Sequence, residues 1–156
     1  METHRKLCTL AAKYLRLKGL QPFNRCTYSV CELERVGECP DAFGWGMEST
    51  QLIEVKISRS DFFADKNKHW RKNASFGIGK YRSYLCPEGV IEENDLPENW
   101  GLLVYDGKTI KEIVKAKPQV SNSNEEIKLI TSILRRNGIK PQMFSFKNCS
   151  EDKTLK

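Results

Sequence analysis

Two carboxylates and a lysine stand at a spacing that suits metal-assisted chemistry: Asp41, Glu54 and Lys56. We expect two short strands here, the first delivering Asp41 and the second, residues 51–57, delivering Glu54 and Lys56. Side chains two apart on a strand point to the same face, so Glu54 and Lys56 share a face while Val55 takes the other. If the strands pair as a hairpin, Asp41 reaches the same patch. Oxygen ligands of this kind suit a hard divalent cation, Mg²⁺ or Mn²⁺.

An upstream glutamate is a further candidate for the same patch. Residues 25–35 alternate enough to predict a strand, and the chain then turns back towards Asp41. Depending on which two residues form the turn, Asp41 lies opposite Glu34 or opposite Glu32. A three-residue turn would place Leu33 there instead. The residues alone leave the choice between Glu32 and Glu34 open.

A basic helix is predicted directly after the second strand, over residues 60–72, with Ser60 as its N-cap. Its aromatic residues predict a face that packs against the sheet, and we interpret His69 as a surface residue rather than a catalytic base. Basic side chains that follow the site are candidates for sequence-independent contacts with nucleic-acid phosphates. These candidates are Lys66, Lys68, Arg71, Lys72, Lys80 and Arg82.

The elements that must position these residues follow the order α-β-β-β-α-β-β-β-α, which predicts an α/β domain with a mixed sheet between helices. We expect one domain over residues 1–146, a mobile loop over 73–80, and a polar, disordered tail over 147–156. The other expected elements are a helix over 4–18 capped by Thr3, strands over 81–86, 100–105 and 109–117, and a helix over 124–137 whose inward residues are Ile127, Ile130, Ile133 and Leu134.

Composition restricts the class of protein. The chain has 156 residues, 39% of them hydrophobic, and a net charge of +6 that is compatible with a polyanionic partner such as nucleic acid. Six cysteines without a CxxC pair, and only two histidines, argue against a zinc site. We find no signal peptide and no apolar run long enough to span a membrane, so we expect a cytoplasmic protein with reduced thiols.

The motif residues carry a family resemblance. Pro40-Asp41, twelve residues and then Glu54-Val55-Lys56 resemble the PD-(D/E)XK phosphodiesterase superfamily, which includes restriction-type endonucleases and repair nucleases. The residues after the second strand resemble, in particular, its MmcB-like DNA-repair group. Those residues are Ser60-Asp61-Phe62, Asp65, Lys68 and Trp70. The group has a glutamate several residues before the motif aspartate, which favours Glu32 over Glu34. The chain departs from the group at residues 71–80, which look like an insertion, and at Cys86-Pro87, where an acidic residue is usual.

The resemblance implies a restriction-endonuclease-like fold and a Mg²⁺- or Mn²⁺-dependent endonuclease that hydrolyses DNA in repair or in mobile-element or phage DNA processing. It implies that Asp41, Glu54 and the carbonyl of Val55 bind the metal and that Glu32 assists there. Lys56 would then orient the attacking water or stabilise charge on the phosphate. A homodimer is compatible with the resemblance. The alternatives are a catalytically silent nucleic-acid-binding module on the same fold, and a protein-interaction or nucleotide-hydrolysing domain with a coincidental motif.

Overall fold

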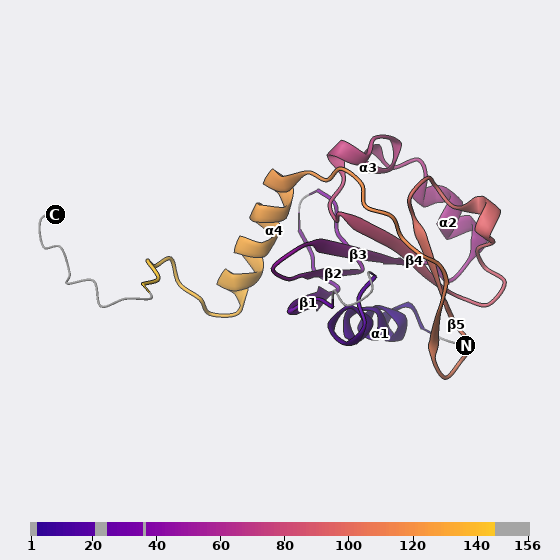
Figure 1. Cartoon of the computed structure of the whole chain (residues 1–156), viewed down its shortest axis with the longest axis horizontal. Helices are drawn as coiled ribbons and strands as arrows, with labels where there is room; N and C mark the ends of the chain where they lie inside the picture. Colours follow the sequence, from indigo (N-terminus) through magenta and orange to yellow (C-terminus); the bar gives the residue numbers. More distant parts are fainter. Residues whose placement is uncertain (1–2, 21–24, 36, 146–156) are drawn as a thin grey trace, which may run out of the picture. The chain divides into compact units, whose positions relative to one another are not determined.

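The structure is a computed structural model, and it describes residues 3–20, 25–35 and 37–145 (Figure 1). The chain divides into two units, residues 1–123 and 124–156, and each unit is described by itself. The first unit contains the sheet and all of the candidate site. Within the described residues, no helix is long and apolar enough to cross a membrane.

Six strands of the first unit form one mixed sheet in the order β1-β2-β3-β4-β5-β6. Strands β1, β2 and β3 pair antiparallel, β3, β4 and β5 pair parallel, and β6 pairs antiparallel with β5. The expected α/β class, a mixed sheet flanked by helices, is therefore confirmed. The strands are β1 (Tyr28–Cys31), β2 (Ala42–Trp45), β3 (Thr50–Val55), β4 (Tyr81–Pro87), β5 (Gly101–Tyr105) and β6 (Ile110–Val114).

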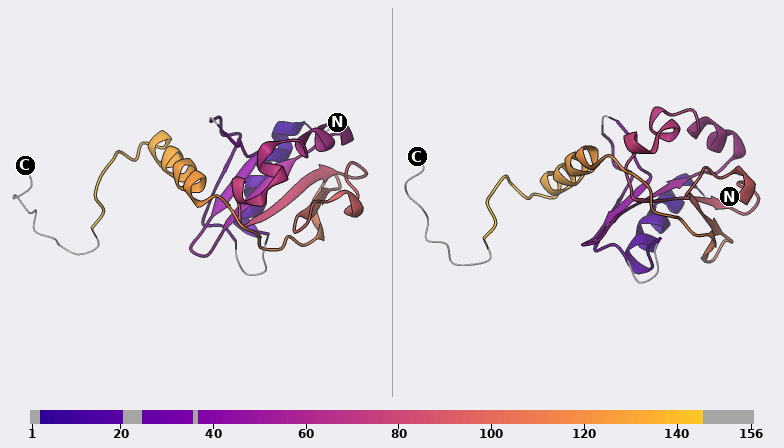
Figure 2. Two further views of the ribbon diagram at one scale, coloured as in Figure 1. Left: turned by 90° about the horizontal axis from the view of Figure 1, so that it is seen from above. Right: turned by 45° about the horizontal axis from the view of Figure 1, so that its top comes forward.

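Helix α1 (His4–Leu17) covers one face of the sheet, opposite the short helices that follow β3 (Figures 1 and 2). Thr3 caps it as predicted, because its hydroxyl accepts from the backbone N–H of Lys6 at 3.3 Å. The helix ends at Gly19, whose φ of +74° is the left-handed conformation that favours glycine. Its apolar stripe and the strand residues facing it form the core: Leu7, Cys8, Ala11 and Leu15 with Ile53, Val55, Leu85 and Leu103.

The predicted helix over residues 60–72 is wrong in two respects. The chain forms two short helices, α2 (Arg59–Asp65) and α3 (His69–Lys72), on the face of the sheet opposite α1. The N-cap is Ser58 rather than Ser60, since the Ser58 hydroxyl accepts from the backbone N–H of Asp61 at 3.2 Å.

The break between α2 and α3 has an electrostatic reason. Asp65 and Arg71 are six residues apart, and an unbroken helix would place them about 120° apart around its axis and about 9 Å apart along it. Lys68 instead adopts an extended backbone, with ψ of 141°. The break allows the Arg71 guanidinium to donate to the Asp65 carboxylate at 2.8 Å.

Residues 73–80, predicted as a mobile loop, have a buried centre at residues 77–79, while the other five are exposed or half-buried. They contain the single 3₁₀ turn η1 (Ala74–Phe76), and Gly77, Ile78 and Gly79 after it are buried. Gly79 has a φ of +90°, and a Cβ there would lie 2.8 Å from the Cβ of Leu52. The glycine thus lets this segment pass directly against β3. A second 3₁₀ turn, η2 (Glu93–Asp95), precedes β5.

The second unit contains helix α4 (Ser123–Arg136), one residue away from the predicted limits at each end. Of the four residues predicted to face inward, Ile133 is buried, while Ile127 is 63% exposed and Leu134 is also exposed. Leu129 is buried in place of Ile127. The predicted tail over residues 147–156 lies outside the described residues.

Candidate functional site

Asp41 lies directly before the start of β2, beside the motif residues of β3. The register pairs Ala42 with Ile53, so Asp41, one residue earlier, comes level with Glu54. The backbone N–H of Val55 donates to the Asp41 carboxylate at 2.9 Å. This bond joins the two halves of the motif and fixes one oxygen of Asp41.

The register also decides between the two upstream glutamates. Cys31 pairs with Ala42, and the N–H of Glu32 donates to the carbonyl of Asp41 at 3.2 Å, so Glu32 lies opposite Asp41. The connection is not a tight turn, because β1 ends at Cys31 and Glu32 has a φ of +53°. The Glu32 carboxylate contacts Arg5 of α1 at 3.3 Å. Glu32 therefore adjoins Asp41 through the backbone, while its side chain turns towards α1.

Glu54 and Lys56 are almost completely buried, with side chains 2% and 5% exposed. The Lys56 ammonium lies 3.4 Å from a Glu54 oxygen and 3.4 Å from an Asp65 oxygen. Burial acts to lower the pKa of Lys56, but Glu54, Asp65 and Asp41 together raise it above its ordinary value. The carboxylates around Lys56 therefore favour its charged form, which donates hydrogen bonds.

Arg71 belongs to the site and not to the nucleic-acid surface for which it was predicted. Its side chain is 2% exposed, and its guanidinium lies 2.8 Å from Asp65 and 3.0 Å from Glu54 and also pairs with Glu38. The guanidinium carbon lies 4.8 Å from the centre of the Trp100 ring. An arginine that is enclosed by three carboxylates and 2% exposed is out of reach of a phosphate on the surface.

Asp65 is the most shared group of the site. Besides Lys56 and Arg71, it accepts from the Tyr84 hydroxyl at 2.8 Å and pairs with Lys68 at 2.7 Å. Burial acts to raise its pKa, but Arg71, Lys56 and the hydrogen bonds from Lys68 and Arg71 hold the pKa well below the usual range. Asp65 is therefore a permanent carboxylate at the centre of the cluster.

Sequence reasoning missed two of these residues as site members. Asp65 was noted only as one of the residues that carry the family resemblance, and no role in the site was predicted for it. Glu38 gave no signal, because it lies in an irregular connection before Pro40. The structure buries it, and the backbone N–H of Ile78 donates to its second oxygen at 2.9 Å. Glu38 thus ties Arg71 to the packed segment after α3.

The charges and donor atoms fit a hard divalent cation. Burial raises the pKa of Glu54 to about 8, Arg71 opposes this rise, and Asp41 adds to it. The cluster contains four carboxylates and three cations, which leaves one negative charge in excess when all of them are ionised. These groups are Glu38, Asp41, Glu54 and Asp65 against Lys56, Lys68 and Arg71. Asp41, Glu54 and the Val55 carbonyl offer only oxygen, the ligand type that Mg²⁺ and Mn²⁺ prefer.

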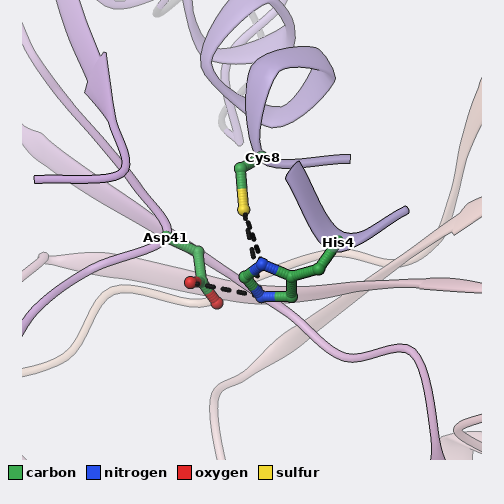
Figure 3. Close-up of side chains that lie close together, drawn as sticks. All are labelled: His4, Cys8 and Asp41. Carbon is green, nitrogen blue, oxygen red and sulfur yellow. Dashed lines mark hydrogen bonds and ion pairs between the residues drawn. The ribbon is translucent and has the colours of Figure 1, made fainter. Parts of the chain in front are cut away.

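The other oxygen of Asp41 faces the start of α1. Figure 3 shows the His4 ring between Asp41 and Cys8: one ring nitrogen lies 3.4 Å from the carboxylate and the other 3.4 Å from the Cys8 sulfur. Nitrogen, sulfur and oxygen atoms of these residues lie within 4.8 Å of one another, a donor set typical of zinc. However, the two ring nitrogens of His4 face different partners, one the Asp41 carboxylate and the other the Cys8 sulfur. A chain of side-chain contacts accounts for the cluster, whose effect is to orient Asp41.

Arg82 was predicted to contact nucleic acid, and the structure corrects this. It is 1% exposed, and its guanidinium donates to the backbone carbonyls of Gly79, Ala74 and Val120 at 2.7, 2.9 and 2.8 Å. These bonds hold the packed segment after α3 to the chain that leads to α4. Arg82 is therefore an interior structural residue.

The remaining predicted phosphate ligands differ in exposure. Lys66 is half-buried, and its ammonium donates a hydrogen bond to the backbone carbonyl of Asp95 at 2.7 Å. Lys68, Lys72 and Lys80 are exposed. His69 is also exposed, as predicted, and its ring stacks on Phe76 with centroids 4.5 Å apart. The basic surface beside the site is thus made by Lys68 and Lys72 rather than by six cations, since Lys80 lies next to Thr50, at the other end of β3 from Glu54.

No protein-family model matches the chain, and no curated protein matches it. A solved structure described as "SPO1766 protein of unknown function from Silicibacter pomeroyi" is similar, with 21% sequence identity and a TM-score of 0.48. The similarity covers 76% of this chain and 85% of that one.

Proposed function

We propose that the protein is a metal-dependent nuclease that hydrolyses phosphodiester bonds in DNA. The observation that carries the proposal is the register of β2 and β3, which brings Asp41 level with Glu54 and lets Val55 donate to Asp41, with the Lys56 ammonium 3.4 Å from Glu54. The oxygen donors of Asp41, Glu54 and the Val55 carbonyl support a role for a divalent ion. This proposal retains the function that the PD-(D/E)XK resemblance implies.

Each motif residue then has a distinct task. A bound Mg²⁺ or Mn²⁺ would supply charge to the scissile phosphate and a water of lowered pKa. Asp41, Glu54 and the Val55 carbonyl would hold the ion, and the contacts from Val55 and His4 orient Asp41 for this. Lys56, kept charged by its carboxylate neighbours, would stabilise negative charge that develops on the phosphate.

The approach of DNA would use the exposed lysines. Lys68 links the buried site to the exposed basic surface, because its ammonium pairs with Asp65 while its side chain is 41% exposed. Lys72, which is also exposed at the end of α3, extends the basic surface. Contacts of this kind give affinity that falls with salt and does not depend on base sequence.

A catalytically silent nucleic-acid-binding module is the second candidate. It is favoured by the closed ion pairs of the site, in which Glu54, Lys56 and Arg71 are each at most 5% exposed and are paired within the cluster. Such a module would keep the basic surface and the fold, with the cluster serving stability alone.

A cleavage assay separates the two candidates. Linear, nicked, flapped and branched DNA would be incubated with the protein and Mg²⁺, Mn²⁺ or EDTA. We expect metal-dependent cleavage that Lys56→Ala abolishes and that Lys111→Ala leaves unchanged, because Lys111 is an exposed lysine of β6 that pairs with Asp106. DNA binding without cleavage of any substrate would favour the silent module.

A further inference from the structure

The two cations that contact Glu54 share a second partner. Lys56 lies 3.4 Å from Glu54 and 3.4 Å from Asp65. Arg71 lies 3.0 Å from Glu54 through one nitrogen and 2.8 Å from Asp65 through another. Asp65 is therefore placed to keep both cations if Glu54 releases them.

The other partners of Arg71 are themselves anchored. Asp65 accepts from the Tyr84 hydroxyl, and Glu38 accepts from the backbone N–H of Ile78. The Trp100 ring lies against the guanidinium. An Arg71 that lost its contact with Glu54 would still have two carboxylates and an aromatic face, so its charge would remain compensated.

A divalent ion and Arg71 need the same group. A guanidinium 3.0 Å from the carboxylate neutralises Glu54, and a cation bound by Glu54 and Asp41 would replace that neutralisation. A divalent ion bound by Glu54 would lie close to the guanidinium and repel it more strongly than the singly charged Lys56 does, so binding of the ion and the Arg71–Glu54 contact are antagonistic.

We propose that Arg71 is an internal counter-cation of Glu54, which occupies that carboxylate until a divalent ion displaces it, and that Asp65 retains Arg71 after the displacement. The proposal rests on the proposed metal-dependent function. Arg71 is in this account a positioning residue that sets metal affinity without touching the substrate. The exchange breaks one ion pair and forms no covalent bond.

Calorimetric titration of Mn²⁺ into the full chain tests the proposal, because the two key variants have opposite expected signs. Arg71→Gln removes the competitor and should tighten Mn²⁺ binding about tenfold, the effect of one nearby charge on a carboxylate. Asp65→Asn removes the carboxylate that retains Lys56 and Arg71, so both cations stay on Glu54. This variant should bind Mn²⁺ more weakly, by about the same factor. A purely structural role for both residues would weaken binding in both variants.

Arg82→Gln is the matched control. Arg82 is as deeply buried as Arg71, but its partners are backbone carbonyls and not site carboxylates. We expect it to lower the melting temperature and leave the Mn²⁺ affinity unchanged. If Arg71→Gln does not fold, Arg71→Lys serves, since lysine keeps the charge without the three-way fork and should tighten binding to a smaller extent.

Two outcomes overturn the inference in distinguishable ways. If wild type binds Mn²⁺ and Arg71→Gln binds it equally or more weakly, Arg71 is not a competitor, while the proposed nuclease function stands. If neither wild type nor any variant binds Mn²⁺, the metal-dependent function fails and the inference fails with it.

Discussion

Asp65→Asn should destabilise the protein strongly, because Asp65 is the carboxylate that most groups of the site share. Removing one partner of a buried ion pair costs about 3–5 kcal/mol. After the change Arg71 and Lys56 each still pair with Glu54. We therefore expect a loss of stability at the lower end of this range, about 3 kcal/mol. For a chain of this size, that is a drop in melting temperature of roughly 6–12 °C.

The pH dependence of the Asp65→Asn effect gives an independent check. Because the pKa of Asp65 is held below its unfolded value, the carboxylate stabilises the fold above the unfolded pKa of about 3.9. That stability is lost as the pH falls below this value towards the folded pKa. The difference between wild type and Asp65→Asn should therefore be constant near neutral pH and should shrink below about pH 4.

Urea denaturation followed by circular dichroism measures both effects. Asp95→Asn is the control, because Asp95 makes the same kind of ion pair at the surface, 3.0 Å from Arg59. Its effect should be a small fraction of that of Asp65→Asn. A loss of under about 1 kcal/mol in Asp65→Asn, the range of exposed pairs, would refute the view that the cluster is a buried, mutually dependent network.

Three further predictions concern the fold and the surface. Gly44→Ala should cost about 1–3 kcal/mol in urea denaturation, because its Cβ would lie 2.6 Å from the Cys26 sulfur; a neutral result would mean that Cys26 can move away. Thr3→Ala should cost about 1 kcal/mol through loss of the cap of α1, and Thr3→Ser should restore it; equal stability of the three proteins would show that the cap contributes nothing. Replacing Lys68 and Lys72 by alanine should weaken DNA binding equally for unrelated sequences and flatten its salt dependence in fluorescence anisotropy; an unchanged slope would show that both lysines are merely solvated.

Local patterns were sufficient for most of the sheet. The apolar run of β3 predicted a strand buried on both faces, and residues 51–56 are indeed all buried. Asp106-Gly107 predicted the turn between β5 and β6, and Gly107 has the positive φ, +94°, that such a turn uses. These features depend on residues that are close together in the chain, so local sequence patterns were enough to predict them.

The errors concern contacts between distant residues. Arg71 and Glu38 are 33 residues apart, and Arg82 and Val120 are 38 apart. Local composition made both arginines look like surface cations, whereas burial against carboxylates or carbonyls determines their role. The same long-range pairing divides the predicted helix, because Arg71 meets Asp65 only when the helix breaks.

The site motif contains one feature that local spacing predicted and one that it left open. The spacing within β3 predicted that Glu54 and Lys56 share a face, and their side chains meet at 3.4 Å. The choice between Glu32 and Glu34 opposite Asp41 depended on the length of a turn, which the residues left open. The observed connection is longer than either proposed turn, although its register is the one that places Glu32 opposite Asp41.

Mn²⁺ calorimetry on wild type, Asp41→Asn and Lys56→Ala, with cleavage measured on the same samples, tests the central claim most directly. Asparagine keeps the shape of Asp41 but removes the charge that a small hard cation needs, whereas Lys56 is not a ligand. The account predicts that wild type binds Mn²⁺, that Asp41→Asn loses both binding and cleavage, and that Lys56→Ala keeps binding while losing cleavage. Mn²⁺ binding by Asp41→Asn at wild-type affinity, or cleavage by Lys56→Ala at the wild-type rate, would contradict it.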